Sequence, residues 1–133
     1  MTGLGPVALR ELEAGLDEQL AALDGLDGAL DDERDALRAA APERLEEAAA
    51  TKSNWVERVE AGQSALLKYA ARYGHDGREN LETWLERAGT ETARLREMLA
   101  RVRSMTKTCL ERNQRNGAVI EGANRQVQEA LAA

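Results

Sequence analysis

The segment LRELEAGLDEQLAALDGLDGALDDERDAL, residues 9–37, decides the fold because its leucines follow the spacing of a helix–helix seam. Five of them are separated by seven residues each and three more lie beside these: Leu9, Leu16, Leu23, Leu30 and Leu37, with Leu12, Leu20 and Leu26. A seven-residue apolar repeat puts these side chains on one face of an α-helix, where another helix can pack on them. Pro6 suits a first helical turn, and Pro42 disfavours the α conformation at the residue before it. We therefore expect a first helix over about residues 6–40.

A second helix is expected over about residues 42–73, opened by Pro42, with a weaker and more alanine-rich apolar face. The segment that follows, YGHDGREN, indicates a loop. In it Gly74 can end a helix in a left-handed conformation, and Asp76 with Glu79 resembles a capping box. The chain should reverse near this loop as well as near Ala41.

The rest of the chain, from about residue 78 to 131, keeps apolar residues at spacings of three and four. This pattern fits one very long helix or two helices separated near Gly117. Short connections and the seven-residue leucine spacing favour antiparallel neighbours. We therefore predict an all-α fold, an elongated antiparallel bundle of three long helices with the third one continuous or broken, as a single domain over residues 1–133.

The composition narrows the classes of function. The chain has 24 acidic and 18 basic residues, a net charge of −6, and its basic residues are not clustered. Nucleic acid and stable membrane association are therefore not expected. The N-terminal sequence lacks the basic and apolar segments of a signal peptide and no stretch is apolar enough to span a membrane, so we expect a cytoplasmic protein.

Catalysis is not expected either. His75 is the one histidine, lies in the glycine-rich loop and is interpreted as a solvated residue, which leaves no candidate metal site and no nucleophile–base pair. Cys109 is the one cysteine and lies on an apolar helical face, where a buried inert thiol is expected. We predict a protein without cofactors that is not an enzyme.

The segment CLERNQRNGAVIEGANRQVQEAL, residues 109–131, keeps helical spacing although it contains three asparagines and two glycines. These are poor helix formers, and each glycine costs a helix roughly 1 kcal/mol relative to alanine. Polar and small residues of this segment continue the apolar face: Asn113, Asn116, Gly117, Ile120, Asn124, Val127 and Leu131.

Two interpretations of this face stay open. The asparagines could fix the register of the helix inside the bundle, as a polar core residue does in coiled coils. Alternatively, the face could accept a helix of another protein, with Gly117 and Gly122 allowing close backbone approach and the asparagine amides bonding to the incoming chain.

The same residues resemble a known family. LERNQRNGAVIEGANRQVQEAL, residues 110–131, is similar to the Asn-x-x-Asn-Gly segment near the C-terminus of FlgN-type flagellar export chaperones. ERDAL at residues 33–37 and LEEAAATKSNWVERV at residues 45–59, which contains Lys52, resemble the first and second helices of that family.

The resemblance implies a cytoplasmic chaperone without catalytic activity. Such a chaperone binds the C-terminal helical regions of the hook-associated proteins that form the hook–filament junction, prevents their premature assembly and delivers them to the type III export gate. The residues that fall on the motif or continue its face are implied to bind the partner: Asn113, Asn116, Gly117, Ile120, Glu121, Gly122, Val127 and Leu131. The alternative is a structural coiled-coil protein whose apolar stripes are buried in a stable homo-oligomer.

Overall fold

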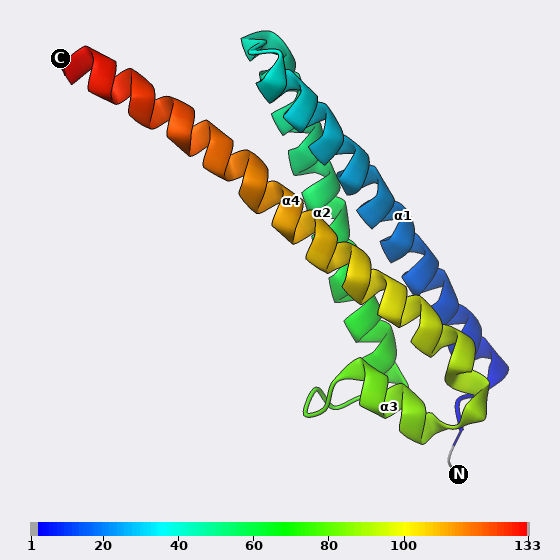
Figure 1. Ribbon diagram of the computed structural model, residues 1–133. Coiled ribbons are helices and arrows are strands. Elements are labelled where there is room, and N and C mark those ends of the chain that lie inside the picture. The colour runs from blue at the N-terminus through cyan, green and yellow to red at the C-terminus, as the bar shows by residue number, and fades with distance from the viewer. Residues whose placement is uncertain (1–2, 133) are drawn as a thin grey trace.

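The computed structural model describes residues 3–132, with the side chains of residues 3–122, Arg125 and Glu129 (Figure 1). This part of the chain is all α and contains no strand; helices make up 88% of the structure. The elements are α1 (Pro6–Arg38), α2 (Pro42–Arg72), α3 (Leu81–Ala88), a short 3-10 turn η1 (Thr90–Thr92) and α4 (Ala93–Ala132). The predicted all-α helical bundle is confirmed.

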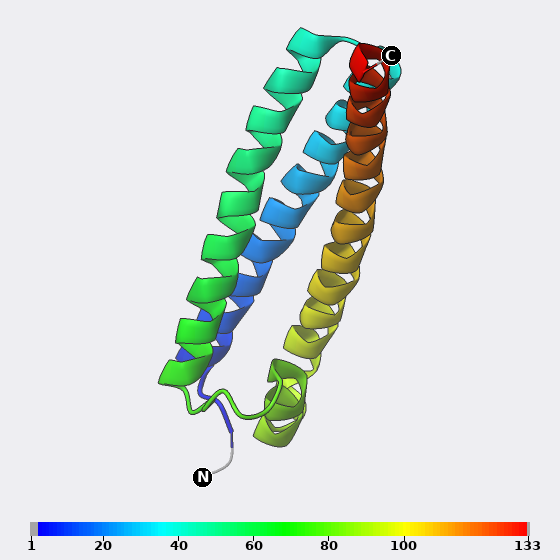
Figure 2. The ribbon, with the colours of Figure 1, turned by 90° about the vertical axis from the view of Figure 1, so that its left-hand side faces the viewer.

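The long helices run up, down and up (Figure 2). A turn of three residues reverses the chain between α1 and α2, and within it Ala40 adopts a φ of 49°, unusual for a residue other than glycine. The second reversal begins at Gly74, whose φ is 109°. Both expected reversals are therefore present. Helix α1 packs against both α2 and α4, whereas α2 and α4 make few direct contacts.

The leucine stripe of α1 forms the centre of the core. Leu16, Leu23 and Leu30 are each at most 2% exposed. They pack with α2, α3 and α4 through residues that include Leu66, Ala70, Trp84, Leu95, Leu99, Val102 and Cys109. The two ends of the stripe, Leu9 and Leu37, are only partly buried. The core therefore weakens towards both ends of α1.

Two glycines of this bundle are explained by close packing. A Cβ added at Gly25 would lie 2.5 Å from the ring of Trp55, and one added at Gly62 would lie 2.2 Å from Oε1 of Gln19. These contacts bring α1 and α2 together more closely than side chains would allow.

The third expected helix, residues 78–131, is broken at Gly89 rather than near Gly117. Gly89 has a φ of 121°, a conformation that L side chains rarely adopt. The hydroxyl of the fully buried Thr92 donates to the carbonyl oxygens of Leu85 at 2.6 Å and of Gly89 at 2.8 Å, which holds the bend. Gly117, by contrast, continues α4 without interruption.

The expected capping box of Asp76 and Glu79 is also wrong. Asn80 caps α3, because its Oδ1 accepts a hydrogen bond from the backbone N–H of Thr83 at 2.8 Å. Asp76 instead accepts from the backbone N–H of Arg78 at 2.9 Å, which closes a local turn within the loop.

His75 is not the solvated residue that we expected. It is 9% exposed and meets Trp84 edge to face, with the ring centroids 5.5 Å apart. Its Nε2 lies 2.7 Å from the carbonyl oxygen of Glu79. The loop folds back onto α3, and the imidazole closes this end of the core.

Helix α4 is the longest, with 40 residues against 33 in α1 and 31 in α2. It begins beside α1 and tilts away from it, so that its C-terminal turns stand apart from both other long helices (Figure 1). The separation therefore comes from the divergence of α4 as well as from its greater length.

Candidate functional site

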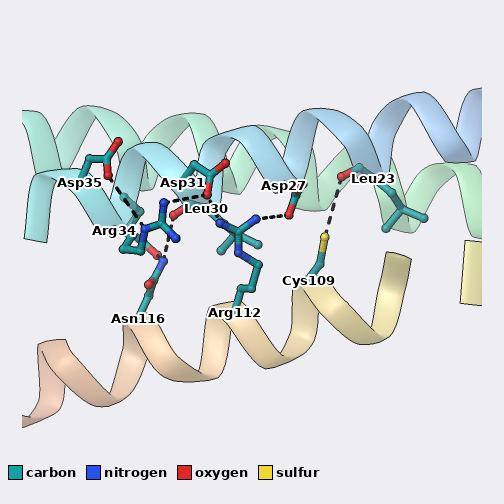
Figure 3. Close-up of polar contacts among 10 residues, drawn as sticks. Leu23, Asp27, Leu30, Asp31, Arg34, Asp35, Cys109, Arg112 and Asn116 are labelled. Carbon is teal, nitrogen blue, oxygen red and sulfur yellow. Dashed lines mark hydrogen bonds and ion pairs between the residues drawn. The ribbon is translucent and has the colours of Figure 1, made fainter. Parts of the chain in front are cut away.

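Three consecutive turns of α4 are joined to α1 by polar contacts (Figure 3). The thiol of Cys109 lies 3.8 Å from the carbonyl oxygen of Leu23. One turn further on, Arg112 forms ion pairs with Asp27 and Asp31. Together with the asparagine of the following turn, these contacts fix the register of α4 along α1.

The third contact belongs to a polar cluster made of Glu33, Lys52, Asn113 and Asn116, which joins all three long helices. The Nζ of Lys52 lies 2.9 Å from Oε2 and 3.2 Å from Oε1 of Glu33, and it donates to Oδ1 of Asn113 at 2.9 Å. Asn116 donates from Nδ2 to Oε1 of Glu33 at 3.0 Å and to the carbonyl oxygen of Leu30 at 3.1 Å.

The burial of this cluster shows its structural role. Glu33 is 1% exposed and Asn116 is 6% exposed, so the carboxylate must be compensated inside the fold. Lys52 supplies the compensating charge and Asn116 a further hydrogen bond. Such a buried pair strongly favours one relative position of the helices, because any other leaves the carboxylate unpaired.

The cluster bears on both interpretations of the asparagine face. The amide of Asn116 is used inside the bundle, as expected for a residue that fixes register, and this arrangement gives no support to its assignment to partner binding. Asn113 is exposed but bonded to Lys52. For both asparagines a role in binding a partner remains a prediction.

Cys109 is buried, as expected, at 4% exposed. Burial raises the pKa of its thiol, and the nearby carboxylate of Asp27 raises it further. The thiolate that would react is therefore disfavoured.

Beyond the polar cluster, α4 has a different surface. A Cβ added at Gly117 or Gly122 would meet no described atom within 4 Å, so close packing in the bundle does not require either glycine. Val119 is 55% exposed and Glu121 is exposed, while Ile120 is partly buried but lies outside the hydrophobic core. The remaining residues predicted on this face lie outside the described side chains: Asn124, Val127 and Leu131.

A family comparison bears on the whole chain. The family model described as FlgN protein matches residues 1–133. The chain belongs to the FlgN family. This makes it a member of a family of flagellar export chaperones rather than of an enzyme family. Neither curated proteins nor solved structures gave a match.

Two further findings concern the part of this FlgN-family chain that the structure describes. It contains no group of three or more histidine, cysteine, aspartate or glutamate residues arranged to hold a metal ion. Within the same residues, no helix combines the length and hydrophobicity required of a membrane span.

A cleft of about 350 Å³ lies between the C-terminal part of α1 and α4. It lies next to the polar cluster and is lined by Arg34, Leu37, Arg38, Arg115, Asn116 and Val119. Within this lining, the side-chain amide of Asn116 is fixed by its hydrogen bonds to Leu30 and Glu33. The cleft thus lies at the point where α4 changes from the part bonded to α1 to the part that diverges from it.

The pairing of Glu33 with Lys52 was not predicted from the sequence, although α1 carries a signal for it. One seven-residue repeat of α1 runs through positions 12, 19, 26 and 33. Leucine occupies the first and third of these positions, whereas the second and fourth are Gln19 and Glu33. Both polar residues are buried, at 3% and 1% exposed. A glutamate at a seam position requires a partner from another helix, and Lys52 is that partner.

Proposed function

We propose that this protein is a cytoplasmic chaperone that binds the C-terminal helical regions of the flagellar hook–filament junction proteins. Binding would cover the surface through which such a protein assembles and so prevent early association. The chaperone would then deliver the bound junction protein to the type III export gate. The resemblance of the asparagine–glycine segment and the family match support this proposal.

We place the binding surface on residues 117–131 of α4, with Gly117, Ile120, Glu121 and Gly122 as its described part. The observation that carries this assignment is that a Cβ added at either glycine would meet no described atom within 4 Å, beside the exposed Val119. A helix keeps such costly residues where a second helix needs close backbone approach. Asn124, Val127 and Leu131 extend the proposed surface by sequence spacing.

Substitution of Ile120 by Asp tests the surface. A charge placed in an interface that must lose its water should abolish binding to the C-terminal peptide of a junction protein in isothermal titration calorimetry. The melting temperature should change by less than about 2 °C, because Ile120 lies outside the core.

Val7→Asp is the matched control. Val7 is 59% exposed at the other end of the molecule, so this variant introduces the same charge without affecting the proposed surface. It should bind like the wild type. A large loss of stability in Ile120→Asp would show that the residue belongs to the bundle, and unchanged binding would remove it from the interface.

The second candidate is a homo-oligomer, which the exposed Leu110 and Val119 on α4 favour. Sedimentation equilibrium separates the two. A tight dimer or tetramer that occludes the end of α4 supports the oligomer, whereas a monomer that forms a 1:1 complex with a junction protein supports the chaperone.

A further inference from the structure

We propose that the cleft between the end of α1 and α4 binds a carboxylate side chain of the partner helix, together with an apolar side chain one turn away. This inference rests on the proposed function and specifies the chemistry of the partner. It assigns a recognition role to Arg38 and Arg115, which the sequence motif does not include.

The shape of the cleft fits one turn of a helix. Leu37 forms an apolar wall on α1, and Val119, more than half exposed, forms another on α4. At about 350 Å³ the space can hold one large apolar side chain and a neighbouring polar one. The cleft therefore combines apolar side chains with the arginines Arg34, Arg38 and Arg115.

The three arginines that line the cleft differ in their ion pairs. Arg34 is held by its own helix, with contacts of 3.3 Å to Asp31 and 3.9 Å to Asp35. No carboxylate of the described residues lies within 4 Å of the side-chain nitrogens of Arg38 or Arg115, both of which are exposed. Of the carboxylates at this end of α1, Asp31 and Asp35 lie against Arg34, and Asp31 also pairs with Arg112.

Three of the six residues that line this cleft are arginines, although the chain has a net charge of −6. Guanidinium groups bind carboxylates through paired, charge-assisted hydrogen bonds, and they do so best at the edge of an apolar contact. Charge complementarity therefore selects an acidic amphipathic helix as the occupant. A basic helix would meet repulsion here, which adds discrimination between partners.

The test compares the wild type with the double variant Arg38→Gln/Arg115→Gln in calorimetric titrations. The probes are the C-terminal peptide of a junction protein and the same peptide with its aspartates and glutamates changed to the amides. The double variant should bind the acidic peptide about tenfold more weakly, and with a smaller dependence on salt. With the amide peptide, wild type and variant should bind alike.

Arg101→Gln is the control, since Arg101 is an exposed arginine on the same helix, away from the cleft. The affinity of the Arg101→Gln variant for the acidic peptide should stay within twofold of that of the wild type. If the double variant binds the acidic peptide as well as the wild type does, the cleft assignment is wrong while the proposed function stands. If the double variant instead loses self-association, the occupant is a second copy of the chain, which also overturns the proposal.

Failure of the wild type to bind any junction peptide would contradict the proposed function separately. The cleft can then be tested with two designed amphipathic helices that differ in one glutamate or glutamine placed a turn from a leucine. If the wild type prefers the glutamate peptide and the double variant does not, the assignment of carboxylate binding to the cleft is supported. Equal binding of both peptides overturns it.

Discussion

The two halves of α4 have the same helical spacing but different surroundings. In the first half, Leu95, Leu99 and Val102 are at most 5% exposed against α1. In the second half, the helix tilts away from α1 and Val119 is more than half exposed. Asn116, at the end of the packed part, is bonded inside the bundle, whereas Glu121 beyond it is exposed.

This difference separates the two reasons for which a helix retains unfavourable residues. Asn116 costs helix propensity but compensates a buried carboxylate, so the fold itself explains it. At Gly117, the next residue, an added Cβ would meet no atom of the described side chains within 4 Å, so their packing does not explain this glycine. We therefore place the boundary between the structural face and the proposed partner-binding face within one turn of α4.

The largest contrast should come from removing the same side chain in two places on α4. Leu99→Ala should lower the free energy of unfolding by about 3 kcal/mol, because Leu99 is 1% exposed and its loss leaves a cavity. Leu110→Ala should cost less than about 0.5 kcal/mol, since Leu110 is 58% exposed. Urea denaturation measures both. Both leucines lie in the first half of α4, so equal losses would contradict the packing of this half against α1 through one side only.

The polar cluster should give the next largest effect. Lys52→Met removes the charge that compensates Glu33, and we expect a loss of about 2 kcal/mol in the free energy of unfolding. Because the cluster fixes α4 on the other helices, the variant should also bind the junction peptide more weakly. Restored stability in the double variant Lys52→Met/Glu33→Met would confirm the coupling, whereas additive losses would exclude it.

The glycines provide the smallest contrast, and one of opposite sign. Gly25→Ala should destabilise the protein by about 1 kcal/mol, since the overlap with Trp55 exceeds the gain in helix propensity. Gly117→Ala should stabilise it by about 0.5 to 1 kcal/mol, because the added methyl group meets open space. Thermal melts of both variants, followed by circular dichroism, test these signs. Destabilisation by Gly117→Ala would place that residue in the packed bundle.

The fold was largely predictable because its signals are local and periodic. Leucine spacing and two prolines determine the course of α1 and the first reversal, and the structure agrees within a few residues. The break at Gly89 was missed, since it depends on the buried hydroxyl of Thr92 and on a positive φ that spacing does not reveal. His75 was misassigned for a similar reason, because its partner Trp84 lies on the next helix.

The candidate site could be predicted only in part. Family resemblance pointed to Lys52 and the asparagines as separate motifs, and the structure brings them together around Glu33. The arginines of the cleft have no sequence signature, because Arg38 and Arg115 come from helices far apart in the chain and meet through tertiary packing.

Hydrogen exchange with and without the junction-protein peptide tests the central claim most directly. We predict that backbone amides of residues 95–116 exchange slowly in both states, whereas amides of residues 117–122 exchange faster in the free protein and become protected in the complex. Slow exchange of residues 117–122 in the free protein, or protection by the peptide confined to other helices, would contradict the assignment of this surface to a partner.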